Sequence, residues 1–130
     1  MTEIRVLVGS VDFERSSAFY GDLLGFSVAE HWDGPDGRGT LYQAASGGVI
    51  EIFEDSPHHP FEPPAGVKVA VEVDDADALY GRLTAAKVEI VDPIDDRSWG
   101  HRSFEACDPS GLHLVFFTPS DGTVQAAVER

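Results

Sequence analysis

The chain has 130 residues and a mass of 14.0 kDa, and its 42% hydrophobic and 25% charged residues are typical of one folded domain. Nine Lys and Arg residues against 23 Asp and Glu give a formal net charge of −14. Because this charge repels nucleic acid and anionic lipid and attracts cations, we expect no nucleic acid and no membrane as partner, and we expect a cationic small molecule. The sequence has no apolar run near the roughly 18 residues of a membrane span and no signal-peptide pattern, so the chain is expected to be cytoplasmic. It has a single cysteine, Cys107, so no internal disulfide is expected.

The first half of the chain has the pattern of a strand, a helix and three further strands. Alternating apolar residues in "EIRVLVGSV" predict a strand over residues 3–11. Asp12 is expected to cap a helix that runs from Arg15 to Leu24 and stops at Gly25. Further strands are predicted over residues 26–32, 40–46 and 48–54, with a turn at "DGPDGRG" after the first of them.

The second half repeats this pattern, since "ALYGRLTAAKVEI" echoes "AFYGDLLGFSVAE" sixty positions earlier. A strand is predicted over residues 67–73, then a helix capped by Asp74 or Asp75, then strands over 87–91, 102–108 and 112–117. We therefore predict an α+β fold in which residues 1–130 form a single domain of two tandem βαβββ modules that curve around a cleft. The modules span about 3–55 and 66–118, with a proline-rich linker at 54–66. The tail at 119–130 is either a short helix or disordered.

Three segments in order resemble the vicinal oxygen chelate superfamily: "VDFERSSAFYGDLLGF", "GGVIEIFE" and "SWGHRSFEACDPSGLHLVFF". That superfamily includes glyoxalases, extradiol dioxygenases, and fosfomycin- and bleomycin-resistance proteins, and the resemblance covers residues 3–118. It implies the glyoxalase/bleomycin-resistance fold and a homodimer in which modules of two chains complete the grooves. For an enzyme of that superfamily, the resemblance also implies a divalent metal held by one residue, usually His or Glu, from each of four strands.

The resemblance, combined with the internal repeat, assigns these four metal positions to Arg5, Glu51, Lys68 and Val115. Among them only Glu51 offers a metal donor, because Arg and Lys are protonated and Val has no donor atom. We therefore expect no metal and no cofactor. Arg5, Glu51 and Lys68 are interpreted either as a buried ion cluster that links the modules or as an anchor for an anionic or carbonyl group of a ligand.

Strand alternation also separates two faces of the predicted sheets. One face is entirely apolar and is expected to lie under the helices: Val6, Val8, Ile50, Ile52, Val69, Val71, Leu114 and Phe116. The mixed character of the other face is typical of a small-molecule site. The predicted ligand-binding residues are Arg5, Trp32, Tyr42, Glu51, Phe53, Lys68, Trp99, Phe104 and His113. For Tyr42, Phe53 and Phe104 a place in the core is the alternative, and for the two tryptophans plain packing at the rim.

These observations favour a metal-free binding protein that resembles the bleomycin-resistance type and sequesters a cationic or aromatic compound such as an antibiotic. One alternative is an enzyme of the same fold, a glyoxalase-like lyase or isomerase or a dioxygenase. Its metal ligands would be divergent, or Glu51 or Glu72 would supply acid–base catalysis. A third reading is an accessory or immunity protein of a biosynthetic cluster. The sequence assigns no catalytic residue.

Overall fold

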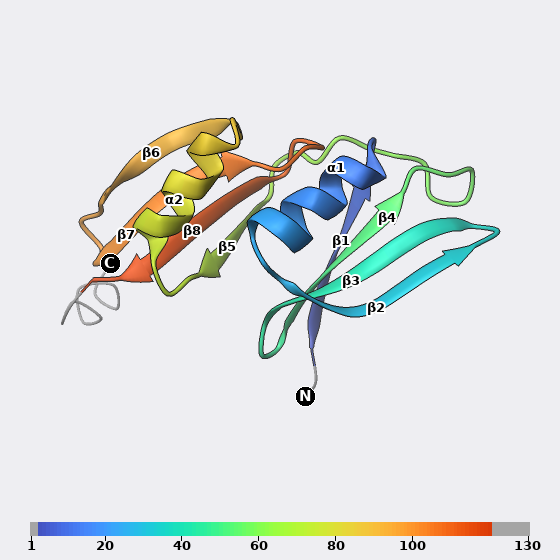
Figure 1. The fold of residues 1–130 in the computed structure, drawn as a ribbon, viewed down its shortest axis with the longest axis horizontal. Helices are drawn as coiled ribbons and strands as arrows, with labels where there is room; N and C mark the ends of the chain where they lie inside the picture. The colour runs from blue at the N-terminus through green and yellow to red at the C-terminus, as the bar shows by residue number, and fades with distance from the viewer. Residues whose placement is uncertain (1–2, 121–130) are drawn as a thin grey trace. The chain divides into compact units, whose positions relative to one another are not determined.

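The computed structural model describes residues 3–120 and divides into two compact units (Figure 1). The first unit extends to Gly66 and includes Asp108–Leu112, and the second contains Val67–Cys107 and the chain from His113 onward. Each unit holds one four-stranded mixed sheet with a helix against one face, which confirms the predicted α+β class. From residue 121 on, the predicted tail lies outside the described residues.

The first unit follows the predicted order of strand, helix and three strands. Its elements are β1 (Ile4–Ser10), α1 (Phe13–Ser17) continued by the π-helical turn η1 (Ala18–Leu23), β2 (Ser27–Gly34), β3 (Gly37–Ala45) and β4 (Gly48–Glu54). The strand order is β1-β4-β3-β2, with β1 parallel to β4 and the other pairs antiparallel.

Local signals set the limits of these elements. Asp12 caps the helix as predicted, since its Oδ1 accepts the N–H of Arg15 at 3.2 Å. Gly25, with φ at 73°, ends the helical segment. The turn between β2 and β3 is shorter than predicted, because Gly37 adopts a φ of 107° that lets the chain reverse after Pro35 and Asp36. Both strands therefore extend into the expected turn.

The second unit repeats the arrangement. Its elements are β5 (Lys68–Glu72), α2 (Ala76–Ala85), β6 (Ile90–Asp96), β7 (His101–Cys107) and β8 (His113–Pro119), in the strand order β5-β8-β7-β6. Asp75 caps α2 by accepting the N–H of Ala78 at 3.0 Å. The strand predicted at 87–91 begins later, because Lys87, with φ at 62°, still belongs to the end of α2 and Val88 donates back to Leu83 O at 3.0 Å.

The helix-covered faces form the core, as strand alternation predicted. Ile50, Ile52, Leu114 and Phe116 are at most 2% exposed, and α1 packs on β4 while α2 packs on β6, β7 and β8. Tyr20 is fully buried and donates its hydroxyl to Asp108 Oδ2 at 2.7 Å, within the first unit. Burial, followed by the nearby carboxylate, raises the pKa of this phenol.

None of the helices within residues 3–120 combines the length and the apolar character that crossing a membrane requires.

Candidate functional site

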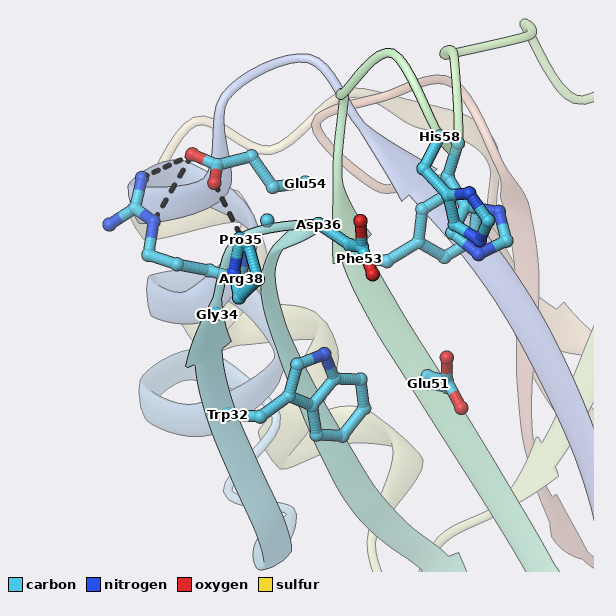
Figure 2. Close-up of a pocket in the computed structure, with 11 residues that line it drawn as sticks. Trp32, Gly34, Pro35, Asp36, Arg38, Glu51, Phe53, Glu54 and His58 are labelled. Carbon is cyan, nitrogen blue, oxygen red and sulfur yellow. Dashed lines mark hydrogen bonds and ion pairs between the residues drawn. The ribbon is translucent and has the colours of Figure 1, made fainter.

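A hollow of about 290 Å³ lies in the first unit, along β2, β4 and the β2–β3 turn (Figure 2). Part of its lining is aromatic and part is charged. The aromatic lining residues are Trp32, Phe53, His58 and His59, and the charged ones are Asp36, Arg38, Glu51 and Glu54. The hollow therefore contains three of the residues predicted from the sequence to bind a ligand, Trp32, Glu51 and Phe53.

Strand register places the aromatic residues in one row across the first sheet. Trp32 lies opposite Gly39, Gly39 opposite Phe53, and Phe53 opposite Gly9. A methyl carbon added to Gly39 would stand 2.6 Å from Trp32 Nε1 and closer still to two indole carbons, so the indole covers this glycine. At Gly9 the added carbon would meet the Phe53 ring at 3.4 Å. Aromatic and glycine positions alternate, and each ring lies over its glycine neighbour.

The linker that follows β4 folds back and forms one wall of the hollow. The Phe61 N–H donates to Asp55 Oδ1 at 2.8 Å, and the His59 N–H donates to Ser56 Oγ at 3.1 Å. These bonds hold the His59 ring 5.0 Å from the Phe53 ring, centroid to centroid. The sequence predicted only a connector here. The feature of the sequence that could have indicated this wall is the cluster "HHPF" at residues 58–61, shortly after the strand that carries Phe53.

The charge of the hollow is negative, with three carboxylates against one guanidinium in its lining. Arg38 donates to Glu54 Oε2 from both Nε, at 3.1 Å, and Nη2, at 2.7 Å, and this bonding lowers the pKa of the Glu54 carboxyl. Glu51 Oε1 accepts from Arg5 Nη1 at 3.1 Å. Such a surface raises the local concentration of cations.

Lys68 and His113, two further predicted site residues, meet in the second unit on a carboxylate that the sequence pattern does not single out. Glu105 is 8% exposed; its Oε1 accepts from Lys68 Nζ at 2.9 Å and its Oε2 lies 2.5 Å from His113 Nδ1. Burial by itself would raise the pKa of Glu105, but the bonds from His113 and Lys68 outweigh it and hold that pKa below its ordinary value. The feature that could have indicated Glu105 is its place on β7 directly opposite Val115, one of the four positions considered for a metal ligand.

The remaining predicted residues lie elsewhere. Tyr42 and Phe104, which are 3% and 1% exposed, pack in the core and do not line the hollow. Their register partners are Ile50 and Phe116, so strand alternation turns them toward the helix-covered face. Trp99 is half-buried in the turn before β7.

The donor atoms present do not fit the metal that the superfamily's enzymes hold. At the four positions that the resemblance assigns to metal ligands, Arg5 binds Glu51, the only carboxylate among them, while Lys68 binds Glu105 and Val115 has no donor atom. Within residues 3–120, no three His, Cys, Asp or Glu side chains are grouped so that they could hold a metal ion.

The family model described as "Glyoxalase/Bleomycin resistance protein/Dioxygenase superfamily" matches residues 4–122. The fold is similar to that of TioX from Micromonospora sp. ML1, at 22% identity and a TM-score of 0.72 over 92% of this chain and 99% of that one. It is also similar to that of TnmS3, an antibiotic binding protein from Streptomyces sp. CB03234, at 24% identity and a TM-score of 0.73 over 92% and 97% of the two chains. A glyoxalase/bleomycin resistance protein/dioxygenase from Nocardioides is 25% identical, with a TM-score of 0.67 over 94% and 85%. No curated protein matches.

Proposed function

Because the chain belongs to the glyoxalase/bleomycin resistance protein/dioxygenase superfamily, we propose that it is a metal-free binding protein that sequesters a cationic or aromatic small molecule such as an antibiotic. The observation that carries the proposal is the hollow of the first unit, where an aromatic row lies beside three carboxylates. The similarity to TnmS3, an antibiotic binding protein, supports the same class of ligand.

The chemistry of the hollow suits such a ligand. A cation held over an aromatic face gains about 0.5 to 2 kcal/mol, more when water is excluded. Asp36 and Glu51 add carboxylates along the same hollow, and Trp32, Phe53 and the two histidines supply ring faces and edges (Figure 2). This combination of apolar rings and a few charged groups can bind and orient a molecule without transferring a group to it.

Thermal unfolding in the presence of cationic antibiotics and aromatic metabolites tests the proposal. A ligand present at 100 times its dissociation constant is expected to add about 2.7 kcal/mol to the stability. Glu51→Gln is expected to weaken the stabilisation by cations. The matched control, Glu72→Gln, changes an exposed carboxylate of the second unit outside the hollow and is expected to change nothing. If no compound stabilises the wild-type protein, or if Glu51→Gln binds cations as well as Glu72→Gln does, the proposal is wrong.

One observation favours a second candidate, an enzyme of the same superfamily. The buried Glu105 carboxylate holds His113 at Nδ1, which is the arrangement that leaves Nε2 to exchange a proton with a substrate. Mass spectrometry of each stabilising compound after incubation distinguishes the two candidates. If a product forms with the wild-type protein and not with His113→Gln, the protein is an enzyme and the sequestration proposal is wrong.

The cytoplasmic location and the homodimer stay predictions. Sedimentation velocity with the purified protein tests the dimer, and fractionation of the producing cells tests the location.

A further inference from the structure

We infer that Gly39 is a specificity-determining residue of the hollow. It lets the Trp32 indole lie flat on the first sheet, so the hollow prefers compounds with a flat aromatic ring system to compact cations. The inference rests on the proposed function, because it names the class of ligand that the same hollow accepts.

The position of the indole depends on the missing side chain at Gly39. Gly39 is buried and lies directly opposite Trp32 on the neighbouring strand. The added methyl carbon, 2.6 Å from Trp32 Nε1 and nearer to two ring carbons, would stand closer than the 3.0 Å that real side chains respect. Because the obstacle is a rigid bicyclic ring, any other residue at position 39 would push the whole indole off the sheet. Glycine inside a strand weakens the strand and often marks a place where another group approaches the backbone closely; at Gly39 that group is the Trp32 indole.

A flat indole gives the hollow a floor. Figure 2 shows the Trp32 side chain reaching from β2 toward β4, on the side where the Glu51 carboxylate lies. In the next register position along the row, the Phe53 ring lies over Gly9, with its centroid 5.0 Å from that of His59. A planar ligand contacts a ring face over its whole area, whereas a compact cation reaches the carboxylates but covers little of the ring. The flat floor therefore adds affinity mainly for planar compounds.

Isothermal titration calorimetry with two probes tests the inference. Proflavine is a planar tricyclic cation, and tetraethylammonium is a compact cation without a ring. We expect the wild-type protein to bind proflavine at least tenfold more tightly than tetraethylammonium. Gly39→Ala is expected to weaken proflavine binding at least tenfold and to change tetraethylammonium binding less than twofold. The matched control is Gly48→Ala in β4, where the added methyl would meet Ala45 Cβ at an ordinary 3.5 Å, and we expect it to bind both probes as the wild type does.

A double substitution separates the steric effect from a general loss of folding. In a Trp32→Ala protein the obstacle is gone, so adding Gly39→Ala is expected to change neither the melting temperature nor proflavine binding further. If Gly39→Ala lowers the melting temperature equally with and without Trp32, the steric argument is overturned.

The inference and the proposed function fail in different ways. Equal proflavine affinity in Gly39→Ala and wild type, or equal wild-type affinity for the two probes, overturns the inference and leaves sequestration standing. A wild-type protein that shows saturable binding of neither probe and no stabilisation in the antibiotic screen overturns both.

Discussion

The two sheets have the same strand order, but the rows that cross them at the same register position carry different side chains. In the first sheet the row consists of Trp32, Gly39, Phe53 and Gly9. In the second sheet it consists of Asp95, Ser103, Phe117 and Glu72. Ser103 accepts a hydrogen bond from Arg97 Nε at 3.0 Å, and the His101 ring stacks on Phe117 at 4.2 Å between centroids. The second row thus has three polar side chains and one aromatic ring, on which His101 stacks, while the first row has two aromatic rings and two glycines.

Outside these rows, several contacts within the first unit have a counterpart at the corresponding place in the second unit. Arg38 at the start of β3 bonds to Glu14 in the first turn of α1, and Arg102 at the start of β7 bonds to Asp77 in the first turn of α2. Asp12 and Asp75 cap the two helices in the same way. The helix-covered face and its caps therefore fix the fold of each unit, and the opposite face can change without altering that fold.

The largest expected effect is on stability and comes from the helix-covered face that each unit has. Phe116→Ala is expected to cost about 3 to 5 kcal/mol of unfolding free energy and Ile52→Ala about 2 to 5, because each leaves a cavity under a helix. Urea denaturation followed by circular dichroism measures both. Val115→Ala, on the opposite face of β8, is the control and is expected to cost less than half as much as Phe116→Ala. Equal losses would mean that the faces are not distinguished by burial.

The next largest effect is expected on ligand binding, which is compared between a variant in the first row and a variant in the second. Trp32→Ala is expected to weaken proflavine binding by about 2 kcal/mol, roughly 30-fold, because the ring under the ligand is lost. Phe117→Ala changes the aromatic residue of the second row and is expected to leave binding within twofold. Calorimetric titration of both variants measures the difference. Equal losses would show that the second row also binds.

A smaller effect depends on pH and belongs to the second unit. Glu105→Gln is expected to cost about 1 to 2 kcal/mol at neutral pH, because the charge-assisted bonds to His113 and Lys68 are lost. Since folding lowers the pKa of Glu105 from its ordinary 4.5, its contribution is complete above that value and is lost as the pH falls through the lower folded-state pKa. The stability difference between wild type and variant should therefore shrink as the pH falls below 4.5. In urea titrations across this range, a constant difference would contradict the assignment.

The smallest effects are expected at the two matched surface arginines. Arg38→Gln and Arg102→Gln remove ion pairs between partly exposed side chains, which contribute little to stability and are screened by salt. Thermal melts should show smaller shifts than for Phe116→Ala, Ile52→Ala or Glu105→Gln, and the shifts should diminish at high salt. A larger loss for one arginine than for the other would show that the shared contacts are not equivalent.

The sequence by itself determined the repeat, the α+β fold, the cap of the first helix and the buried faces of β1, β4, β5 and β8. These features depend on neighbouring residues: Asp12 and Asp75 bond to N–H groups three positions away, and alternation alone buries Ile52 and Phe116. Alternation also placed Glu51, Phe53 and His113 on one side of their strands, and a local signal stopped the first helix at Gly25.

Only the tertiary structure decided which of these side chains meet. Glu105 accepts a hydrogen bond from Lys68, and Gly39 lies under Trp32, because cross-strand register brings together residues that no local pattern connects. The linker was predicted as a connector, but the hydrogen bonds that Asp55 and Ser56 accept from Phe61 N–H and His59 N–H turn it back against Phe53. Propensity and alternation act over a few residues along the chain, whereas a binding surface is made by neighbours in space, and their identity depends on strand order and register.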